Sequence, residues 1–311
     1  MYKNKKKIAI LLSTYNGEKY ITEQLQSLLN QTLQAFTIYI RDDGSLDNTL
    51  KICQHFQQLN PSKVVITEDD DGNIGAKQSF NALLCSVESS YYMFCDQDDV
   101  WLSHKVSDSL EFFESKLSSD NKPMLIYTDA MIVDSELAVM HDSLIKYQGK
   151  NPNLTFKNSI FNGVALGCTM LFNHALKEIS YPISEYAVMH DSWITKVAIT
   201  VGEVYYLDIP TIHYRQHDNN VYGLKKSKFL GKLKFSRQAI MSSQGYLVYK
   251  ETLEVLDRFS YSEEQIELKN TLTEPSSSLS FKLIYLIKHK YINKFLLNNY
   301  KGLSLVLAKK I

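Results

Sequence analysis

Residues 91–101 read YYMFCDQDDVW, and this stretch decides the fold. Its first part, Tyr91–Cys95, has the length and composition of a strand that is buried on both faces. Three carboxylates then follow within four residues, at Asp96, Asp98 and Asp99. Carboxylates this close repel one another unless a cation holds them together. The stretch therefore predicts a buried strand whose end binds a hard divalent ion, Mg²⁺ or Mn²⁺. The alternative is a solvated acidic turn.

Strand and helix signals alternate upstream of this stretch. Apolar runs predict buried strands at Ile8–Ser13, Phe36–Ile40 and Val64–Thr67, and apolar residues at helical spacing separate these runs. The resulting β-α-β-α-β-α-β order is typical of a parallel sheet with helices on both faces. Ligands of such sheets bind beyond the carboxyl ends of the strands. Four polar clusters are expected at those ends: Thr14-Tyr15-Asn16, Asp42-Asp43, Asn73 to Gly75, and Asp96 to Asp99.

The second half of the chain is less regular. Strands are predicted over Leu125–Val133 and Val204–Tyr214, and a short helix is expected to open at Asp191. After Gly223 the spacing of apolar residues is helical only. This change of pattern places a boundary near residue 222.

Composition excludes several classes of protein. The 34 basic and 34 acidic residues cancel, yet residues 1–218 carry 27 acids and 18 bases (net −9) and residues 219–311 carry 7 acids and 16 bases (net +9). A single nucleic-acid-binding domain is not usually built this way, and no aromatic-basic strand motif is present. The four cysteines lack zinc or CxxC spacing, so we expect reduced core thiols in a cytosolic protein. No uninterrupted apolar run reaches about 18 residues, so no transmembrane helix is predicted.

The basic C-terminal region has an amphipathic pattern. Lysines alternate with apolar residues between Phe281 and Leu296. Two interpretations stay open: a helix that lies in the interface of an anionic membrane, and a helical cap that packs on the first domain.

Six ordered motifs resemble those of the family 2 glycosyltransferases of GT-A fold. They are Ser13–Gly17, Arg41–Ser45, Asn73–Gly75, Asp96–Trp101, His190–Trp193 and Tyr214–Gly223. The last two are most similar to bacterial rhamnosyltransferases, which assemble cell-wall or capsular polysaccharides. The implied fold is α/β: a Rossmann-like, mostly parallel central sheet flanked by helices. The implied organisation is a transferase domain over residues 1–222, with a nucleotide-binding half (1–100) and an acceptor-binding half (101–222), followed by a helical basic region over 223–311.

The resemblance also implies which residues bind the donor. Asp43, assisted by Asp42, would read the uracil or thymine base and the ribose. The residues implied to contact the donor are Thr14, Tyr15, Asn16, Asp42, Asp43, Asn73, Gly75, Asp96 and Asp99.

The resemblance implies a second group of residues that bind the metal and catalyse the reaction. Asp96 and Asp98 form the DxD pair, with Asp98 implied as the direct metal contact and Asp99 near the sugar or the metal. His217 is implied as a further metal ligand or a diphosphate contact, and Asp191 as the catalytic base. A positioned carboxylate can remove the proton of an attacking hydroxyl, and a single displacement inverts the anomeric centre.

The function implied is an inverting, metal-dependent hexosyltransferase that uses Mn²⁺ or Mg²⁺. L-Rhamnose from dTDP-rhamnose is the favoured donor sugar, and a polysaccharide or lipid-linked glycan is the acceptor. The enzyme would be cytoplasmic and peripheral at the inner face of the plasma membrane, without a nucleic-acid partner, and a homodimer stays open. Two alternatives remain: a UDP-hexose or UDP-N-acetylhexosamine donor, and a non-catalytic nucleotide-sugar-binding partner of another transferase.

Overall fold

The computed structural model describes residues 7–67, 71–117, 121–161, 165–218, 234–276 and 279–291. The chain divides into two compact units, each assembled from separate stretches of sequence. Unit 1 comprises Met1–Asn153, Ala165–Pro182 and Glu203–Gly223, and unit 2 comprises Leu154–Val164, Ile183–Gly202 and Leu224–Ile311. The boundary expected near residue 222 lies outside the described residues and stays a prediction.

Unit 1 contains, among its described residues, a nine-stranded sheet in the order β3-β2-β1-β4-β8-β6-β9-β5, with β7 beside β6. Strands β1 to β4 pair in parallel, as do β6 and β9, whereas β5, β7 and β8 run antiparallel to their neighbours. The predicted α/β fold with a mostly parallel central sheet is confirmed. The strands are β1 Ile8–Thr14, β2 Phe36–Asp42, β3 Val64–Ile66, β4 Tyr91–Cys95, β5 Val100–Trp101, β6 Met124–Val133, β7 Val139–His141, β8 Met170–Asn173 and β9 Glu203–Arg215.

The register of the sheet aligns the carboxyl ends of β1, β2 and β4. Thr14 at the end of β1 pairs with Asp42 at the end of β2, and Leu12 pairs with Cys95, the last residue of β4. Side chains on β1 and β4 are almost completely buried, as unbroken apolar runs require. The polar turns that follow these three strands therefore leave the sheet at the same edge, which we call the acidic edge.

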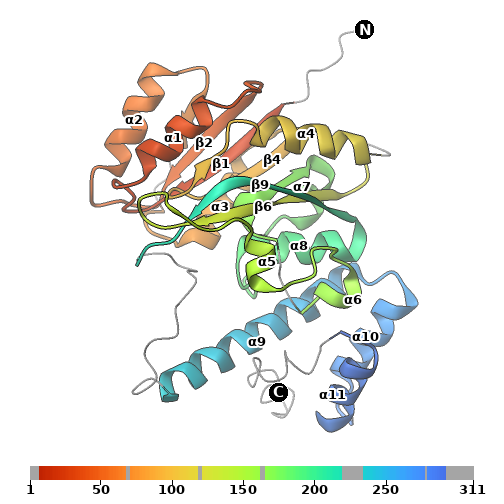
Figure 1. The fold of residues 1–311 in the computed structure, drawn as a ribbon. Helices are drawn as coiled ribbons and strands as arrows, with labels where there is room; N and C mark the ends of the chain where they lie inside the picture. The colour runs from red at the N-terminus through yellow and green to blue at the C-terminus, as the bar shows by residue number, and fades with distance from the viewer. Residues whose placement is uncertain are drawn as a thin grey trace. The chain divides into compact units, whose positions relative to one another are not determined.

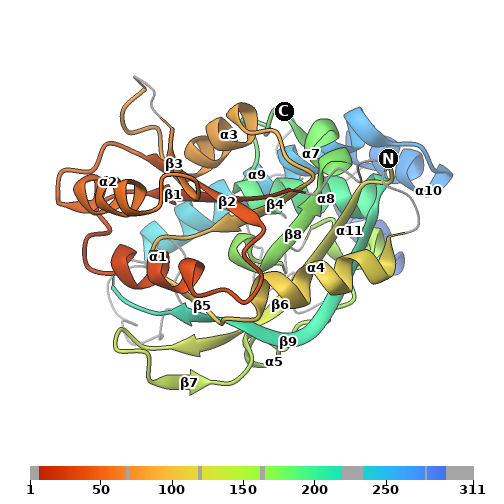
Figure 2. The same cartoon turned by 90° about the horizontal axis from the view of Figure 1, so that it is seen from above.

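Helices cover both faces of this sheet (Figures 1 and 2). Helices α1 (Ile21–Leu29), α2 (Thr49–Leu59) and α4 (Lys105–Lys116) lie on one face, and α3 (Ala76–Ser86) and α7 (His174–Ser180) lie on the other. A short helix, α5 (Leu144–Gln148), packs on β6, and a 3₁₀ turn, η1 (Gly167–Thr169), leads into β8. This two-sided covering is why the central strands carry no polar face.

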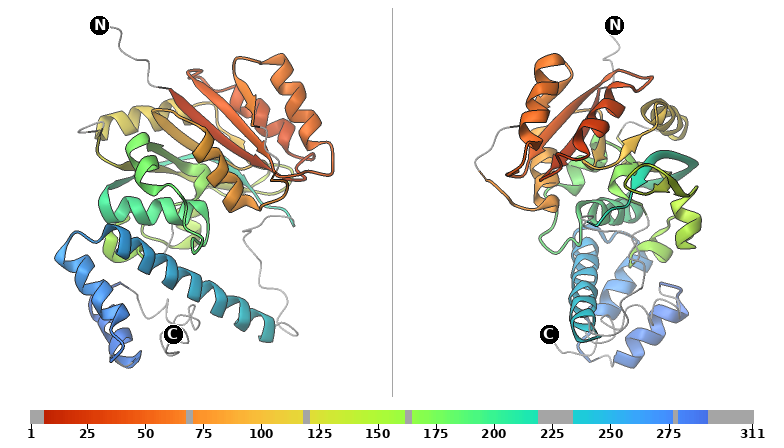
Figure 3. Two further views of the ribbon diagram at one scale, coloured as in Figure 1. Left: turned by 180° about the vertical axis from the view of Figure 1, so that it is seen from behind. Right: turned by 60° about the vertical axis from the view of Figure 1, so that its left-hand side comes forward.

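Unit 2 is helical in its described part. Its helices are α6 (Phe156–Ser159), α8 (His190–Val201), α9 (Lys234–Phe259), α10 (Glu263–Thr273) and α11 (Leu279–Lys288). Helix α9 packs against both α8 and α10 (Figure 3).

A buried ion pair joins α8 to α9. Lys196 Nζ lies 2.6 Å from Glu251 Oε2, and these side chains are 2% and 0% exposed. Ser192 on α8 donates a second hydrogen bond to the same carboxylate oxygen, at 3.0 Å. Removing one partner of a buried pair typically costs about 3–5 kcal/mol, because the other charge is left uncompensated. Helix α8 is therefore fixed in part by a residue more than fifty positions further along the chain.

The described part of the basic C-terminal region packs within unit 2. Leu286 and Tyr291 are buried, whereas Phe281 is half exposed. Lys282 Nζ donates to the carbonyl of Leu272 at 2.8 Å. The rest of the amphipathic pattern, including Leu296, lies outside the described residues, so contact with a membrane stays a prediction. Among the described helices, none combines the length and apolar character that crossing a bilayer requires.

The cysteines correct one expectation. Cys53, Cys95 and Cys168 are buried free thiols, as predicted, but Cys85 is exposed near the end of α3. Its sulfur accepts a hydrogen bond from the Tyr181 hydroxyl at 3.0 Å. An apolar sequence context did not reveal this exposure, because the last turn of a helix can face solvent even beside buried leucines.

Candidate functional site

Asp43 is buried at the end of β2, and its carboxylate holds the loop that enters α3. Oδ1 accepts from the Arg41 guanidinium at 2.6 Å and from the backbone N–H of Ile74 at 2.9 Å, while Oδ2 accepts from the N–H of Gly75 at 2.8 Å. Gly75 has a φ of +82°, which favours glycine, and it caps α3. A carboxylate has about four acceptor positions, so Asp43 retains room for one further donor.

Gln97 joins the turn after β4 to the turn after β1. Its Oε1 accepts from the Thr14 hydroxyl at 2.6 Å and from the backbone N–H of Tyr15 at 2.8 Å, and its Nε2 donates to the Tyr15 carbonyl at 3.0 Å. Thr14 is buried, whereas Tyr15 is 44% exposed. A Cβ at Gly17 would lie 2.2 Å from Gln97 Oε1, so a larger residue there would displace the Gln97 side chain from these hydrogen bonds. Tyr15 is thus the more exposed of these predicted donor contacts.

Asn16 and Asp42 both shape the turn that contains Ser45. The backbone N–H of Asn16 donates to Ser45 Oγ at 2.9 Å, and Asn16 Oδ1 accepts from the N–H of Leu46 at 2.8 Å. Asp42 accepts from the backbone N–H and the hydroxyl of Ser45, at 2.9 and 2.6 Å. These two predicted donor residues therefore lock neighbouring loops together. Asn73 is exposed in the loop before α3.

Asp98 and His217 come together at the acidic edge, as the sequence predicted for two metal ligands. His217 Nε2 lies 2.8 Å from Asp98 Oδ2, and both side chains are largely buried. The His217 ring stacks on the ring of Tyr20, with centroids 4.6 Å apart. An imidazole and a carboxylate held together in this way form a preorganised pair of ligand-type groups.

Arg215 is the residue that holds this arrangement in place, and sequence reasoning assigned it no role. Its backbone N–H donates to Asp99 Oδ1 at 3.1 Å, and its Nε donates to the Asp98 carbonyl at 2.9 Å. The rest of the guanidinium donates to the Ser135 carbonyl at 2.6 Å and to the Glu23 carboxylate, and it lies over the Tyr20 ring. The signal available in the sequence was an arginine two residues before the predicted ligand His217.

Asp96 and Asp99 belong to the same turn as Asp98; Asp99 is buried and Asp96 is partly exposed. Asp99 is 1% exposed, and its Oδ2 has no nitrogen or oxygen hydrogen-bond partner in the described part of the chain. Burial, with the charges of Asp98 and Asp96, raises the pKa of Asp99 well above its usual value. A bound cation would offset this cost. The carboxylates and the imidazole are ligand types that a divalent metal ion binds, although among the described residues Asp96 groups closely with Asp99 and Cys168 rather than with Asp98 and His217.

Asp191 lies in the first turn of α8, where a negative charge is stabilised by the helix dipole. Its Oδ1 accepts from the backbone N–H of Ser192 at 2.7 Å. Asp191 belongs to unit 2 and the acidic edge to unit 1. Its role as the base, and its relation to the acidic edge, stay predictions.

His190, next to Asp191, gives a test of stability against pH. Burial lowers the pKa of His190 from 6.5 to about 3, so the folded protein keeps it neutral. Between about pH 3 and 6.5 the unfolded chain binds a proton that the folded chain does not, so stability falls as the pH falls. The expected loss between pH 6.5 and 5 is about 2 kcal/mol.

Urea denaturation of the wild type and of His190→Asn at pH 7 and pH 5 measures this loss. The variant should lose less stability on acidification, by roughly that amount. Equal losses in the two proteins would show that His190 is protonated in the folded state.

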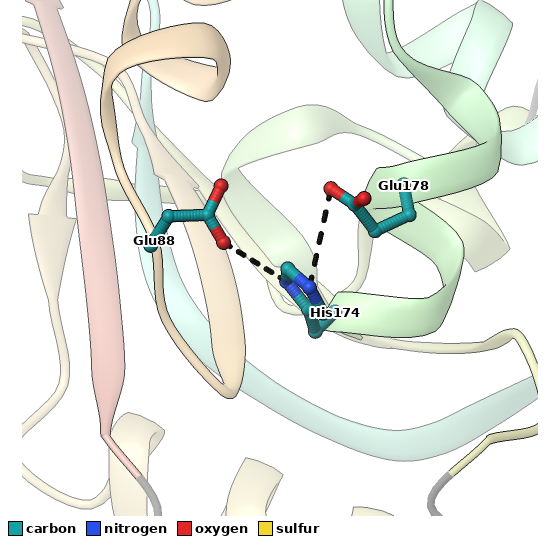
Figure 4. A group of neighbouring side chains, drawn as sticks. All are labelled: Glu88, His174 and Glu178. Carbon is teal, nitrogen blue, oxygen red and sulfur yellow. Dashed lines mark ion pairs between the residues drawn. The ribbon is translucent and has the colours of Figure 1, made fainter.

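A further cluster of ligand-type side chains lies at the opposite edge of the sheet, before β4. His174 lies 3.5 Å from Glu88 and 3.9 Å from Glu178 (Figure 4). Lys177 Nζ already bridges the two carboxylates, at 2.5 and 3.0 Å. Burial opposes its charge, but the hydrogen bonds that Lys177 donates to Glu88 and Glu178 raise its pKa to about 12. The lysine supplies the cation here, so this cluster ties α7 to the loop before β4.

Comparisons with known proteins show the family of the chain. The family model of glycosyl transferase family 2 matches residues 9–180, which span β1 to α7 and include the acidic turns after β1, β2 and β4. The chain belongs to glycosyl transferase family 2. Among relatives of this family 2 glycosyltransferase, a dTDP-rhamnosyl transferase, RfbG of Shigella flexneri, is 29% identical over 250 residues. That match covers 76% of this chain and 80% of the relative.

Other relatives of this glycosyltransferase are named for teichoic acid or poly(ribitol-phosphate) as the polymer they act on. A poly(ribitol-phosphate) β-N-acetylglucosaminyltransferase, TarS of Staphylococcus aureus, is 33% identical over 110 residues, covering 35% of this chain and 19% of TarS. The crystal structure of TarS residues 1–349 superposes with a TM-score of 0.58 at 18% identity, covering 89% of this chain and 75% of that one. A mannosyltransferase from Pyrobaculum calidifontis, solved with GDP-Man and Mn²⁺, gives a TM-score of 0.56 at 11% identity, covering 98% and 86%. These likenesses confirm the GT-A fold.

Proposed function

We propose that this family 2 glycosyltransferase moves L-rhamnose from dTDP-rhamnose to a hydroxyl of a polysaccharide or lipid-linked glycan, with inversion. The observation that carries the proposal is the Asp98–His217 pair at the acidic edge, in the same turn as the buried carboxylate of Asp99 and the partly exposed carboxylate of Asp96. The similarity to a dTDP-rhamnosyl transferase over most of both chains supports the choice of sugar.

The residues that would hold Mn²⁺ or Mg²⁺ are Asp98, Asp96 and His217. When bound, the ion supplies positive charge against the diphosphate that leaves. Arg215 fixes the backbone of the turn from which Asp98 projects. The Asp98 side chain is therefore already positioned for the metal before the sugar donor binds. This preorganisation is what the chain itself contributes to the metal site.

Donor and acceptor are then assigned to different residues. The Asp43 carboxylate, with one acceptor position left, would take the N–H of the pyrimidine base, and the exposed Tyr15 ring would border the base. Asp191 would accept the proton of the acceptor hydroxyl as its oxygen attacks the anomeric carbon and the nucleoside diphosphate departs. General-base catalysis of this kind is worth about 10²–10⁴-fold in rate.

The donor is tested by measuring melting temperatures with dTDP-rhamnose, other dTDP-sugars and UDP-sugars, each with and without Mn²⁺. A ligand that binds the folded state at a hundredfold excess over its Kd adds about 2.7 kcal/mol of stability, a rise on the order of 5 °C. We expect the largest rise with dTDP-rhamnose and Mn²⁺ together. A larger rise with a UDP-sugar would overturn the choice of donor.

The second candidate donor is UDP-N-acetylglucosamine. It is favoured by the fold shared with the TarS fragment solved with UDP-GlcNAc, at a TM-score of 0.55 and 18% identity over 96% of this chain. The same melting measurements decide between the two donors. Sugar transfer to an acceptor, measured with the preferred donor, separates an enzyme from a non-catalytic nucleotide-sugar-binding partner.

A further inference from the structure

Asp96, Asp99 and Cys168 form a compact group behind the Asp98–His217 pair. The two aspartates follow β4, and Cys168 lies in the η1 turn before β8. One ligand atom from each residue lies within 4.8 Å of the others. Asp99 and Cys168 are buried, whereas Asp96 is partly exposed and opens the group to solvent. Side chains distant in sequence therefore present two carboxylates and a thiol to one point.

The Asp99 carboxylate is buried and only weakly satisfied, because the side chain that interacts with it is the Cys168 thiol. Asp99 Oδ1 accepts from the backbone N–H of Arg215, but Oδ2 has no nitrogen or oxygen partner among the described residues. A buried carboxylate oxygen left in this state is costly, typically by about 1–3 kcal/mol. The Cys168 thiol beside it is only a weak donor. A metal ion bound to both groups would remove this cost.

We propose that Asp96, Asp99 and Cys168 form a second metal site, which takes a thiophilic divalent ion such as Zn²⁺ or Cd²⁺. Thiolate ligands select soft ions, whereas Mg²⁺ prefers oxygen ligands. On binding, the Cys168 thiol releases its proton to solvent and a metal–sulfur bond forms, while a carboxylate oxygen from each aspartate completes three of four tetrahedral positions. A water takes the fourth.

The geometry requires a small contraction. Zinc–ligand bonds of about 2.0–2.3 Å put tetrahedral ligand atoms roughly 3.5 Å apart, so a group spread over up to 4.8 Å must close by about 1 Å. Asp96, as the most exposed member, is the side chain with room to make that movement. Its carboxylate is also part of the DxD pair, so the thiophilic ion withdraws a ligand from the Asp98 site.

A buried lysine lies near this group, so the negative charge of the two aspartates alone is not enough to bind a metal ion there. Lys105 is fully buried, with its Nζ 3.2 Å from the Thr211 hydroxyl and 4.7 Å from the centroid of the Trp101 ring. Its charge is close enough to interact with Asp99 and Cys168. This charge opposes the binding of any second cation, so a metal–thiolate bond is needed to hold one there. The site should therefore discriminate strongly in favour of soft ions.

Cadmium titration of the full-length protein tests the proposal. The exposed thiol is first removed with Cys85→Ser, and the ultraviolet charge-transfer absorption of a Cd²⁺–thiolate bond is followed. We expect one Cd²⁺ to bind per chain, with about one proton released. In this background Cys168→Ser should abolish the band and weaken Cd²⁺ binding on the order of 100-fold. The matched control Cys53→Ser removes another buried thiol and should keep the band.

Two results would overturn the proposal: a full band in the Cys168→Ser protein, or neither a band nor proton release in the protein that retains Cys168. The second result is obtained with all three site residues unaltered. It therefore tests the proposal even if the Cys168→Ser protein does not fold. Asp99→Asn should also weaken Cd²⁺ binding, and unchanged affinity would remove Asp99 from the site.

The effect on transfer rests on the proposed function and is measured separately. Zn²⁺ should inhibit the Mn²⁺-supported reaction, and Cys168→Ser should relieve that inhibition when each protein is compared with its own uninhibited rate. If no transfer occurs with any donor, the proposed function fails while the cadmium measurements still decide the site. If transfer occurs and Zn²⁺ inhibits both proteins equally, the link between the two sites is overturned.

Discussion

Asp191→Asn is expected to lower kcat for sugar transfer by about 10²–10⁴-fold. Asparagine keeps the shape of the side chain but cannot accept the proton of the attacking hydroxyl. Donor affinity should stay close to that of the wild type, because the residues assigned to the nucleotide lie at the acidic edge of unit 1. Initial rates and donor binding, measured on the same preparation, give the two quantities.

Glu263→Gln is the matched control for this change. Glu263 is an exposed carboxylate in the first turn of α10, also in unit 2, so it shares with Asp191 its favourable interaction with a helix dipole. If the loss of rate came from a weakened helix, the two substitutions would have similar effects. Near wild-type kcat in Asp191→Asn would place the catalytic base elsewhere in the chain.

Arg215→Lys is expected to weaken metal-dependent donor binding and lower kcat/KM by about 10–100-fold, the range measured for residues that orient metal ligands. Lysine keeps the charge but has one amine, which cannot reach the Asp98 carbonyl, the Ser135 carbonyl and Glu23 together. Without these hydrogen bonds, the turn that carries Asp98 is no longer held in one conformation. The Asp98 and Ser135 carbonyls are part-buried, so the loss of their donors would also lower stability, by up to about 1–3 kcal/mol each.

The readout that separates positioning from general instability is the Mn²⁺ concentration that supports half-maximal rate. It should rise in Arg215→Lys at a temperature where the variant is fully folded. Glu23→Gln removes the half-exposed ionic partner alone and should change stability by less than about 1 kcal/mol. An unchanged Mn²⁺ requirement in Arg215→Lys would show that the guanidinium serves stability only.

The fold was largely predictable because its central strands are short, unbroken apolar runs. Such runs at β1 and β4 are what two-sided burial requires, whereas β2 alternates between buried and partly exposed residues, and the rule that parallel sheets bind ligands at their carboxyl ends then gave the acidic edge. The position of β8 was not predictable. It enters the sheet between β4 and β6 and runs antiparallel to both, and an isolated apolar tetrapeptide does not specify its neighbours.

Buried charged residues were the least predictable part of the site. Arg41, Lys105 and Arg215 are almost fully buried. In the sequence, each of these residues looks like an ordinary surface cation. Whether a charged side chain is buried depends on its partners, which come from other segments of the chain. Asp98 and His217 could be paired because both sat in motifs that resembled a known family. Arg215, within one of those motifs, needed the coordinates before it could be given a role.

The Lys196–Glu251 pair has a consequence for engineering relatives of this enzyme. The carboxylate that neutralises the lysine of α8 comes from α9, so neither helix is a self-contained module. A hybrid that joins two parents at a point between α8 and α9 would inherit half of the pair. The two helices should therefore be exchanged as a block, and a chain shortened before residue 234 should fail to accumulate in the cell.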